Sequence, residues 1–174
     1  MTASRDTLPW EETAFWDFSL TVYERKALVT ACHELQDKHD ADVNMLLFCC
    51  WIGASGRGAL ASDDFAHLSE AVSLWQREVV TPLRAARRRL KQPPHALAGQ
   101  AARSLRDTVA AAELESERLE QMALVEVLER KPVITDLERR RQHVASTLAG
   151  YLDFIGSPGN EDAIATLVEE TCRI

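Results

Sequence analysis

The sequence predicts an all-α protein, a single-domain bundle of six to seven helices around one fully buried central helix. Apolar residues recur at steps of three and four along nearly every segment, and no segment alternates in the manner of a half-buried strand. Seven glycines and six prolines among 174 residues are few for a loop-rich or all-β fold. Residues 43–55 are apolar on nearly every side of a helix, so other helices must enclose them.

The N-terminal part predicts a short aromatic helix followed by an amphipathic one. Residues 7–23 are rich in aromatic side chains, and Pro9 suits a first helical turn. Trp10 and Trp16 either anchor the core or line a groove. Residues 24–39 place Leu28, Cys32 and Leu35 on one helical face, and Asp42 is the expected N-cap of the central helix.

The central helix is expected to end in a glycine-containing loop, residues 53–58. This loop lacks a preceding strand and a following Lys–Ser/Thr pair, which a phosphate-binding loop requires. It is therefore predicted to terminate the helix rather than to bind a nucleotide.

Residues 63–91 and 97–130 predict a helical hairpin that turns at Pro93–Pro94. The first helix carries a core seam, and Pro82 should kink this helix without ending it. The seam residues are Phe65, Leu68, Val72, Trp75 and Val79, and we expect both Trp51 and Trp75 to lie in the core. The apolar positions of the second helix include Leu105, Val109, Ala112, Leu119 and Ala123.

Two C-terminal helices complete a single domain over residues 1–174. They are expected at about 136–155, beginning at Asp136, and at 160–172, capped by Asn160.

Composition excludes several classes of protein. With 27 acids against 20 bases, the net charge of −7 argues against a protein that coats nucleic acid. The longest apolar run has eight residues, 45–52, against about 20 for a membrane span. The four cysteines show no CxxC spacing and are predicted to be reduced, which together with the absence of a signal-peptide pattern indicates a cytoplasmic protein.

The strongest functional signal is a basic stretch between residues 84 and 106, which holds seven bases and no acid. These candidate partner-binding residues are Arg84, Arg87, Arg88, Arg89, Lys91, Arg103 and Arg106. A hairpin centred on Pro93–Pro94 would place residues 84–91 beside 97–104, and the glutamates of 113–120 near Trp75, away from the arginines. The tip would then be a basic pole on an acidic body.

Three interpretations of the basic stretch remain open. It forms a solvated or salt-bridged surface, meeting acids of the C-terminal helix such as Glu161 and Glu169. It docks an acidic protein partner. It binds the phosphates of RNA, DNA or a phosphorylated small molecule, for which arginine is well suited.

A metal site is a weaker hypothesis. His33 and Asp37 lie four residues apart and share a helical face, and Asp40 or Asp42 would be a further ligand. Because such spacings are common by chance, the solvated side of an amphipathic helix that ends in a capped turn is the favoured interpretation. No cofactor is predicted.

Several segments together resemble a family of small uncharacterised proteobacterial proteins, a domain of unknown function. The resemblance spans about residues 15–130 and implies a bacterial, cytosolic, helical protein, but it supplies no activity, cofactor or catalytic residue. The segments that carry it are Phe15–Leu20 with Tyr23, Leu35–Asp37, Asp42–Phe48 with Trp51, Trp75, Val79–Val80, Pro82–Arg84 and Arg87–Arg88.

The sequence thus favours a non-enzymatic binding or adaptor protein that contacts an acidic partner through the basic stretch. The alternatives are a small metal-dependent helical enzyme and a phosphate or nucleic-acid binder. No membrane association is expected.

Overall fold

A computed structural model describes residues 14–158 and 160–173, and every regular element among them is helical. The α-helices are α1 (Ala14–Tyr23), α2 (Lys26–His39), α3 (Val43–Ala54), α4 (Ser62–Trp75), α5 (Thr81–Leu90), α6 (Gln100–Val127), α7 (Leu137–Phe154) and α8 (Glu161–Thr171). A π-helix, η1 (Gln76–Val80), joins α4 to α5, and a 3₁₀ turn, η2 (His95–Leu97), precedes α6. Taken with α4 to α5 as one continuous helix, the described residues form seven helices, which confirms the predicted all-α class.

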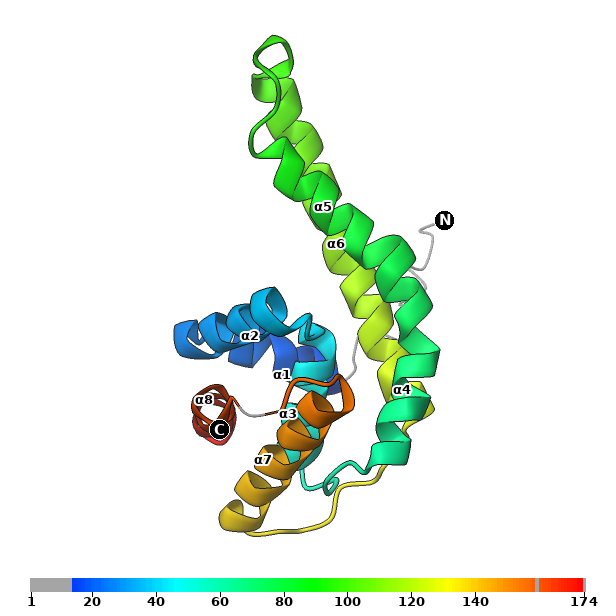
Figure 1. Cartoon of the computed structure of the whole chain (residues 1–174), viewed down its shortest axis with the longest axis vertical. Coiled ribbons are helices and arrows are strands. Elements are labelled where there is room, and N and C mark those ends of the chain that lie inside the picture. Colours follow the sequence, from blue (N-terminus) through cyan, green and yellow to red (C-terminus); the bar gives the residue numbers. More distant parts are fainter. Residues whose placement is uncertain (1–13, 159, 174) are drawn as a thin grey trace, which may run out of the picture. The chain divides into compact units, whose positions relative to one another are not determined.

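The helices group into two compact units, which are described separately. The first combines the residues up to Ala66 with those from Leu128 onward, and the second is residues 67–127 (Figure 1).

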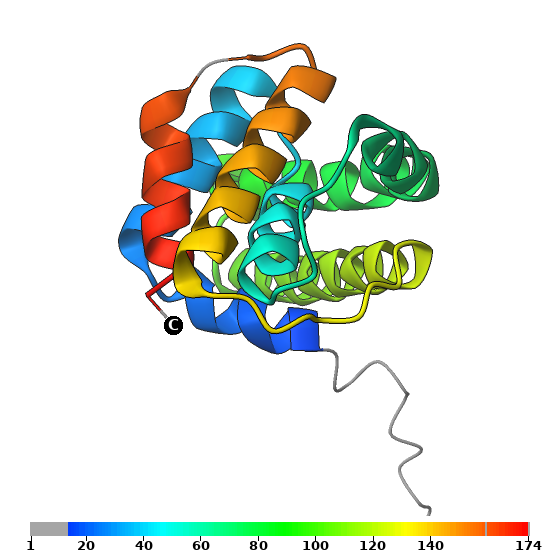
Figure 2. The ribbon, with the colours of Figure 1, turned by 90° about the horizontal axis from the view of Figure 1, so that it is seen from below.

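The first unit is built around α3, as the sequence predicts. All residues from Asn44 to Gly53 are buried, and α3 contacts α1, α7 and α8 (Figure 2). Phe15 of α1 packs its ring 5.2 Å from those of Phe48 and Trp51, which confirms Trp51 as a core residue. Trp16 is half-buried, whereas the predicted positions of Pro9 and Trp10 lie outside the described residues.

Local capping agrees with the sequence at two helix starts out of three. The Asp42 carboxylate accepts a hydrogen bond from the Asn44 amide at 2.8 Å, and the Asp136 carboxylate accepts one from the Arg139 amide at 2.8 Å. Asn160 precedes α8 but has a left-handed backbone with φ of 62° and makes no capping hydrogen bond through its side chain. Asn160 thus occupies the predicted N-cap position of α8, but its side chain does not cap the helix.

Gly53 allows α3 and α7 to approach each other closely. A Cβ at this position would lie 2.5 Å from the backbone nitrogen of Val144. Just beyond it, α3 ends at Ala54, and Gly56 takes a φ of 78° while its carbonyl accepts a hydrogen bond from the Val133 amide at 2.9 Å. The predicted helix-terminating loop is thus confirmed.

The second unit is an antiparallel hairpin, in which α5 and η1 pack against α6 (Figure 1). Pro82 has no amide hydrogen and so cannot donate the usual helical hydrogen bond to the carbonyl four residues earlier. The wider turns of the π-helix η1 immediately precede α5, which contains Pro82. The helix therefore continues past Pro82 into α5, as the apolar pattern predicts.

All four cysteines are buried and free, as predicted. Burial raises the pKa values of the Cys32, Cys49 and Cys50 thiols, that of Cys50 to about 12. These thiols are therefore protonated core side chains at neutral pH.

The contact at Gly53 generates a stability prediction. We expect Gly53→Ala to lower the free energy of unfolding by about 2 kcal/mol or more, because the added methyl collides with backbone rather than with a movable side chain. Urea unfolding followed by circular dichroism measures this. The control, Ala54→Ser, adds one heavy atom at the next, half-buried position and should cost about 0.5 kcal/mol or less. Equal losses in the two variants would contradict the close approach.

Candidate functional site

The basic stretch divides into two sets of residues with different surroundings. Arg84 and Arg87 of α5 face α6 and pair with Glu113 and Glu117. Arg84 donates to Glu117 at 2.8 Å and to Glu113 at 3.3 Å, and Arg87 donates to both carboxylate oxygens of Glu113. We call these four residues the Arg–Glu cluster.

The Arg–Glu cluster is largely withdrawn from solvent. The Glu113 side chain is 6% exposed, and those of Arg84 and Arg87 are 16% and 27% exposed. Desolvation works to raise the pKa of the Glu113 carboxyl, but the hydrogen bonds and charges of Arg87 and Arg84 outweigh it and hold that pKa below its ordinary value. Glu113 is therefore ionised at neutral pH, and both arginines are committed to it.

The predicted hairpin register is wrong beside the arginines. Glu113 and Glu117 lie next to Arg84 rather than away from the arginines, although Trp75 does reach Ser116, as predicted. Residues that pair across an antiparallel hairpin lie at equal distances along the chain from its turn. The pair Arg87–Glu113 therefore centres the turn at residue 100, six residues beyond Pro94. The two prolines disfavour helix in the residues before them, and η2 and Gly99, with a φ of 146°, delay the start of α6 to Gln100.

The remaining bases gather near the end of the hairpin, and we call them the basic tip: Arg88, Arg89, Lys91, Arg103 and Arg106. All are exposed except the half-buried Arg106, which pairs with Asp107 at 2.9 Å. Arg89 donates to the backbone carbonyl of Gln92. Lys91 and Arg103 form no ion pair with any residue that the structure describes.

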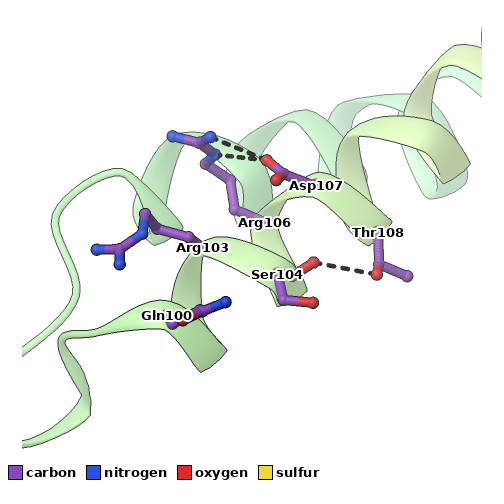
Figure 3. A pocket seen from close by; sticks show the side chains of 6 residues that line it. All are labelled: Gln100, Arg103, Ser104, Arg106, Asp107 and Thr108. Carbon is purple, nitrogen blue, oxygen red and sulfur yellow. Dashed lines mark hydrogen bonds and ion pairs between the residues drawn. The ribbon is translucent and has the colours of Figure 1, made fainter.

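An open, polar depression lies within the basic tip on the first turns of α6. Its lining comprises Gln100, Arg103, Ser104, Arg106, Asp107 and Thr108 (Figure 3). Arg106 turns towards Asp107, whereas Arg103 extends away from that pair. Such a surface suits contact with an acidic group from outside rather than enclosure of a small molecule.

Trp75 is not the core residue that the seam predicts. Its side chain is 37% exposed, and its indole nitrogen donates to the Ser116 carbonyl at 2.9 Å. Phe65, Leu68 and Val72 of the same predicted seam are buried. The π-helix that begins at Gln76 inserts an extra residue per turn, so the seam changes register there.

The sequence did not predict which residues of α6 are buried. Its buried residues are Glu113, Ser116, Glu120, Gln121 and Leu124, and four of these five are polar. The heptad-like spacing from Glu113 through Glu120 was a signal in the sequence, but charged residues at such spacing usually indicate a solvated face.

Two acids of α8 form ion pairs with an arginine close by in the sequence. Arg173 pairs with Glu169 at 2.6 Å and with Glu170 at 3.0 Å. The salt-bridged interpretation of the basic stretch holds for Arg84 and Arg87, and their acids come from α6.

Two of the three metal-site candidates make structural contacts in the first unit. His33 Nε2 lies 3.2 Å from the Tyr23 hydroxyl, and Asp42 caps α3. Among residues 14–158 and 160–173, no three His, Cys, Asp or Glu side chains are placed to hold a metal ion. The structure therefore does not bring His33, Asp37 and Asp42 together as a ligand set.

None of the described helices has the length and apolar character needed to cross a bilayer.

A comparison with protein families gives a match. The family described as "Protein of unknown function (DUF2390)" matches residues 14–124. No curated protein and no solved structure matches the chain significantly.

The Arg–Glu cluster predicts a large effect of a single isosteric change. Glu113→Gln should lower the free energy of unfolding by about 1 to 3 kcal/mol, because it removes the carboxylate that Arg87 pairs with and leaves Arg84 with Glu117 alone. Urea unfolding at neutral pH measures this. The control is Glu34→Gln, which breaks the exposed Glu34–Lys38 pair and should leave stability unchanged. A Glu113→Gln variant as stable as the wild type would mean that the cluster does not hold the hairpin.

The lowered pKa of Glu113 also predicts a pH dependence. A depressed folded-state pKa gives stability that is present above the ordinary value of 4.5 and is lost as the pH falls through the folded pKa. The stability difference between wild type and Glu113→Gln should therefore be constant near neutral pH and shrink under acid conditions. Unfolding curves of both proteins from neutral to acid pH measure it, and a difference that grows towards low pH would contradict the assignment.

Proposed function

The chain belongs to the DUF2390 family of proteins of unknown function, and from its own geometry we propose that it is a non-enzymatic binding protein whose basic tip contacts an acidic protein partner. The observation that carries this proposal is the exposed positive charge left at the end of the hairpin once the Arg–Glu cluster has taken up Arg84 and Arg87. Asp107 is the single acid within residues 84–112.

An acidic protein suits the basic tip better than nucleic acid does. The basic tip is a short positive patch on a chain of net charge −7, and nucleic-acid binders carry a broader basic field. Residues 76–150 also contain no Phe, Trp or Tyr on which an unpaired base could stack. Charge complementarity at an exposed rim instead favours fast, salt-sensitive association between proteins.

We place this activity in the bacterial cytoplasm. The four buried, unpaired thiols support a reducing compartment, and the resemblance to proteobacterial sequences supports the bacterial assignment.

The proposal predicts that binding is lost when the basic tip is reversed in charge. We expect the triple variant Arg89→Glu, Lys91→Glu and Arg103→Glu to retain its fold and to lose the partner. The matched control reverses the exposed Lys26, Lys131 and Arg139 of the first unit, which changes the net charge equally. Arg84 and Arg87 are left intact, since their reversal would disrupt the Arg–Glu cluster.

The experiment is a pull-down from bacterial cytosol at low and high salt, with protein and nucleic acid identified in each eluate. An acidic protein that is retained by wild type and control, released by salt and absent with the tip variant supports the proposal. Retention by the tip variant would overturn it. Nucleic acid in place of protein would favour the phosphate-binding alternative.

A further inference from the structure

A second, apolar surface runs along α6. We call it the α6 seam: Leu105, Val109, Ala112, Leu119 and Ala123, which recur at steps of four, three, seven and four, while Ser116 between Ala112 and Leu119 is buried. Leu105 is 54% exposed and Leu119 is 41% exposed, and Trp75 lies at Ser116 between them. This spacing is that of helices packed side by side in coiled coils and bundles.

The α6 seam and the apolar residues of α5 lie on the same broad face of the hairpin. Arg84 and Glu113 mark the line where α5 meets α6. Leu83 comes one position before Arg84, and Ala112 comes one position before Glu113. Each is therefore rotated by about 100° from the contact line, in the same sense about its own helix axis. In antiparallel helices the same sense of rotation reaches the same face of the pair, and Leu90 falls on that side as well.

The opposite broad face carries charge. Counting from the same contact line, Arg88 and Arg103 rotate in the other sense and lie on the face away from the α6 seam. Leu114, which is 49% exposed, also lies on that opposite face, one position beyond Glu113. The hairpin therefore separates an apolar face from a face with basic residues.

The contact between α5 and α6 inside the hairpin is mainly polar rather than apolar. No residue of α5 is buried, and the α6 residues that face α5 are mostly polar. The contact between the two helices is thus charged, while Leu105 and Leu119 of α6 are exposed and Leu83 and Leu90 of α5 are half-buried. Exposed leucines in line with Trp75, which is 37% exposed, mark an interaction surface, because burying them removes apolar area from water.

The charge along the hairpin indicates which occupant fits. One end carries the basic tip, and the other end exposes acids, among them Glu70 and Glu126. A second copy turned end for end lays an identical four-and-three spacing on the α6 seam and sets the basic end of each chain against the acidic end of the other. Such a two-fold arrangement is self-complementary in both shape and charge.

We propose that two copies of this chain associate through their α6 seams in antiparallel orientation, forming a four-helix bundle from two hairpins. The association is independent of the proposed binding function, because Arg88 and Arg103 lie on the face that the bundle leaves uncovered.

Light scattering coupled to size exclusion tests the association over a range of protein concentrations. We expect wild type at about twice the 19.5 kDa chain mass, and Leu105→Glu with Leu119→Glu at the mass of one chain. The control, Leu114→Glu, changes an equally exposed leucine of the same helix outside the seam and should remain dimeric. If the double variant loses its helical circular dichroism, Ala112→Glu tests the same seam at an exposed alanine.

A single-chain mass for wild type would overturn the proposal, and so would equal dissociation by the Leu114 and seam variants. Orientation is read from a spin label at Gln100→Cys, since all four native cysteines are buried. Antiparallel seams place the two labels about 40 Å apart, given a rise of 1.5 Å per residue along α6. A short label distance would exclude the antiparallel arrangement.

Discussion

The carboxylate of Glu113 lies between the guanidinium groups of Arg84 and Arg87, and the geometry of the second unit depends on this contact. A partly buried ion pair adds little net stability, because the charged groups lose their hydration. It nevertheless specifies register, since sliding α6 by one turn would leave a buried carboxylate without its partners. The register in turn determines which residues face outward. The Arg–Glu cluster thus decides the positions of the basic tip and of the α6 seam.

Different interactions stabilise the interior of each unit. In the first, ten consecutive buried residues of α3 form an apolar core, and the absence of a side chain at Gly53 lets α7 approach closely. In the hairpin, α5 contributes no buried residue, and the buried positions of α6 are mainly polar. Apolar burial accounts for the first unit. The second unit buries Leu68 and Leu124 but leaves Leu105, Leu114 and Leu119 of α6 exposed.

The hairpin presents two surfaces with distinct chemistry. Bases reach solvent near its end and on one broad face, whereas Leu105 and Leu119 of the α6 seam lie on the other face. An acidic partner and a second copy of the chain would therefore contact different residues. Membership of a family without a known activity leaves these surfaces as the basis for assigning function. The two binding proposals rest on these two surfaces.

Local sequence determined the helices, the caps at Asp42 and Asp136, the loop after Gly53 and the enclosure of α3, because periodicity and capping depend on residues close in the chain. It also located the basic stretch. Tertiary structure decided that Arg84 and Arg87 are committed to α6, that Trp75 reaches the surface and that a charged face of α6 is buried. Periodicity shows which residues share a face, but not which face meets a neighbour. That choice depends on hairpin register, which the irregular turn before Gln100 and pairings between distant side chains set together.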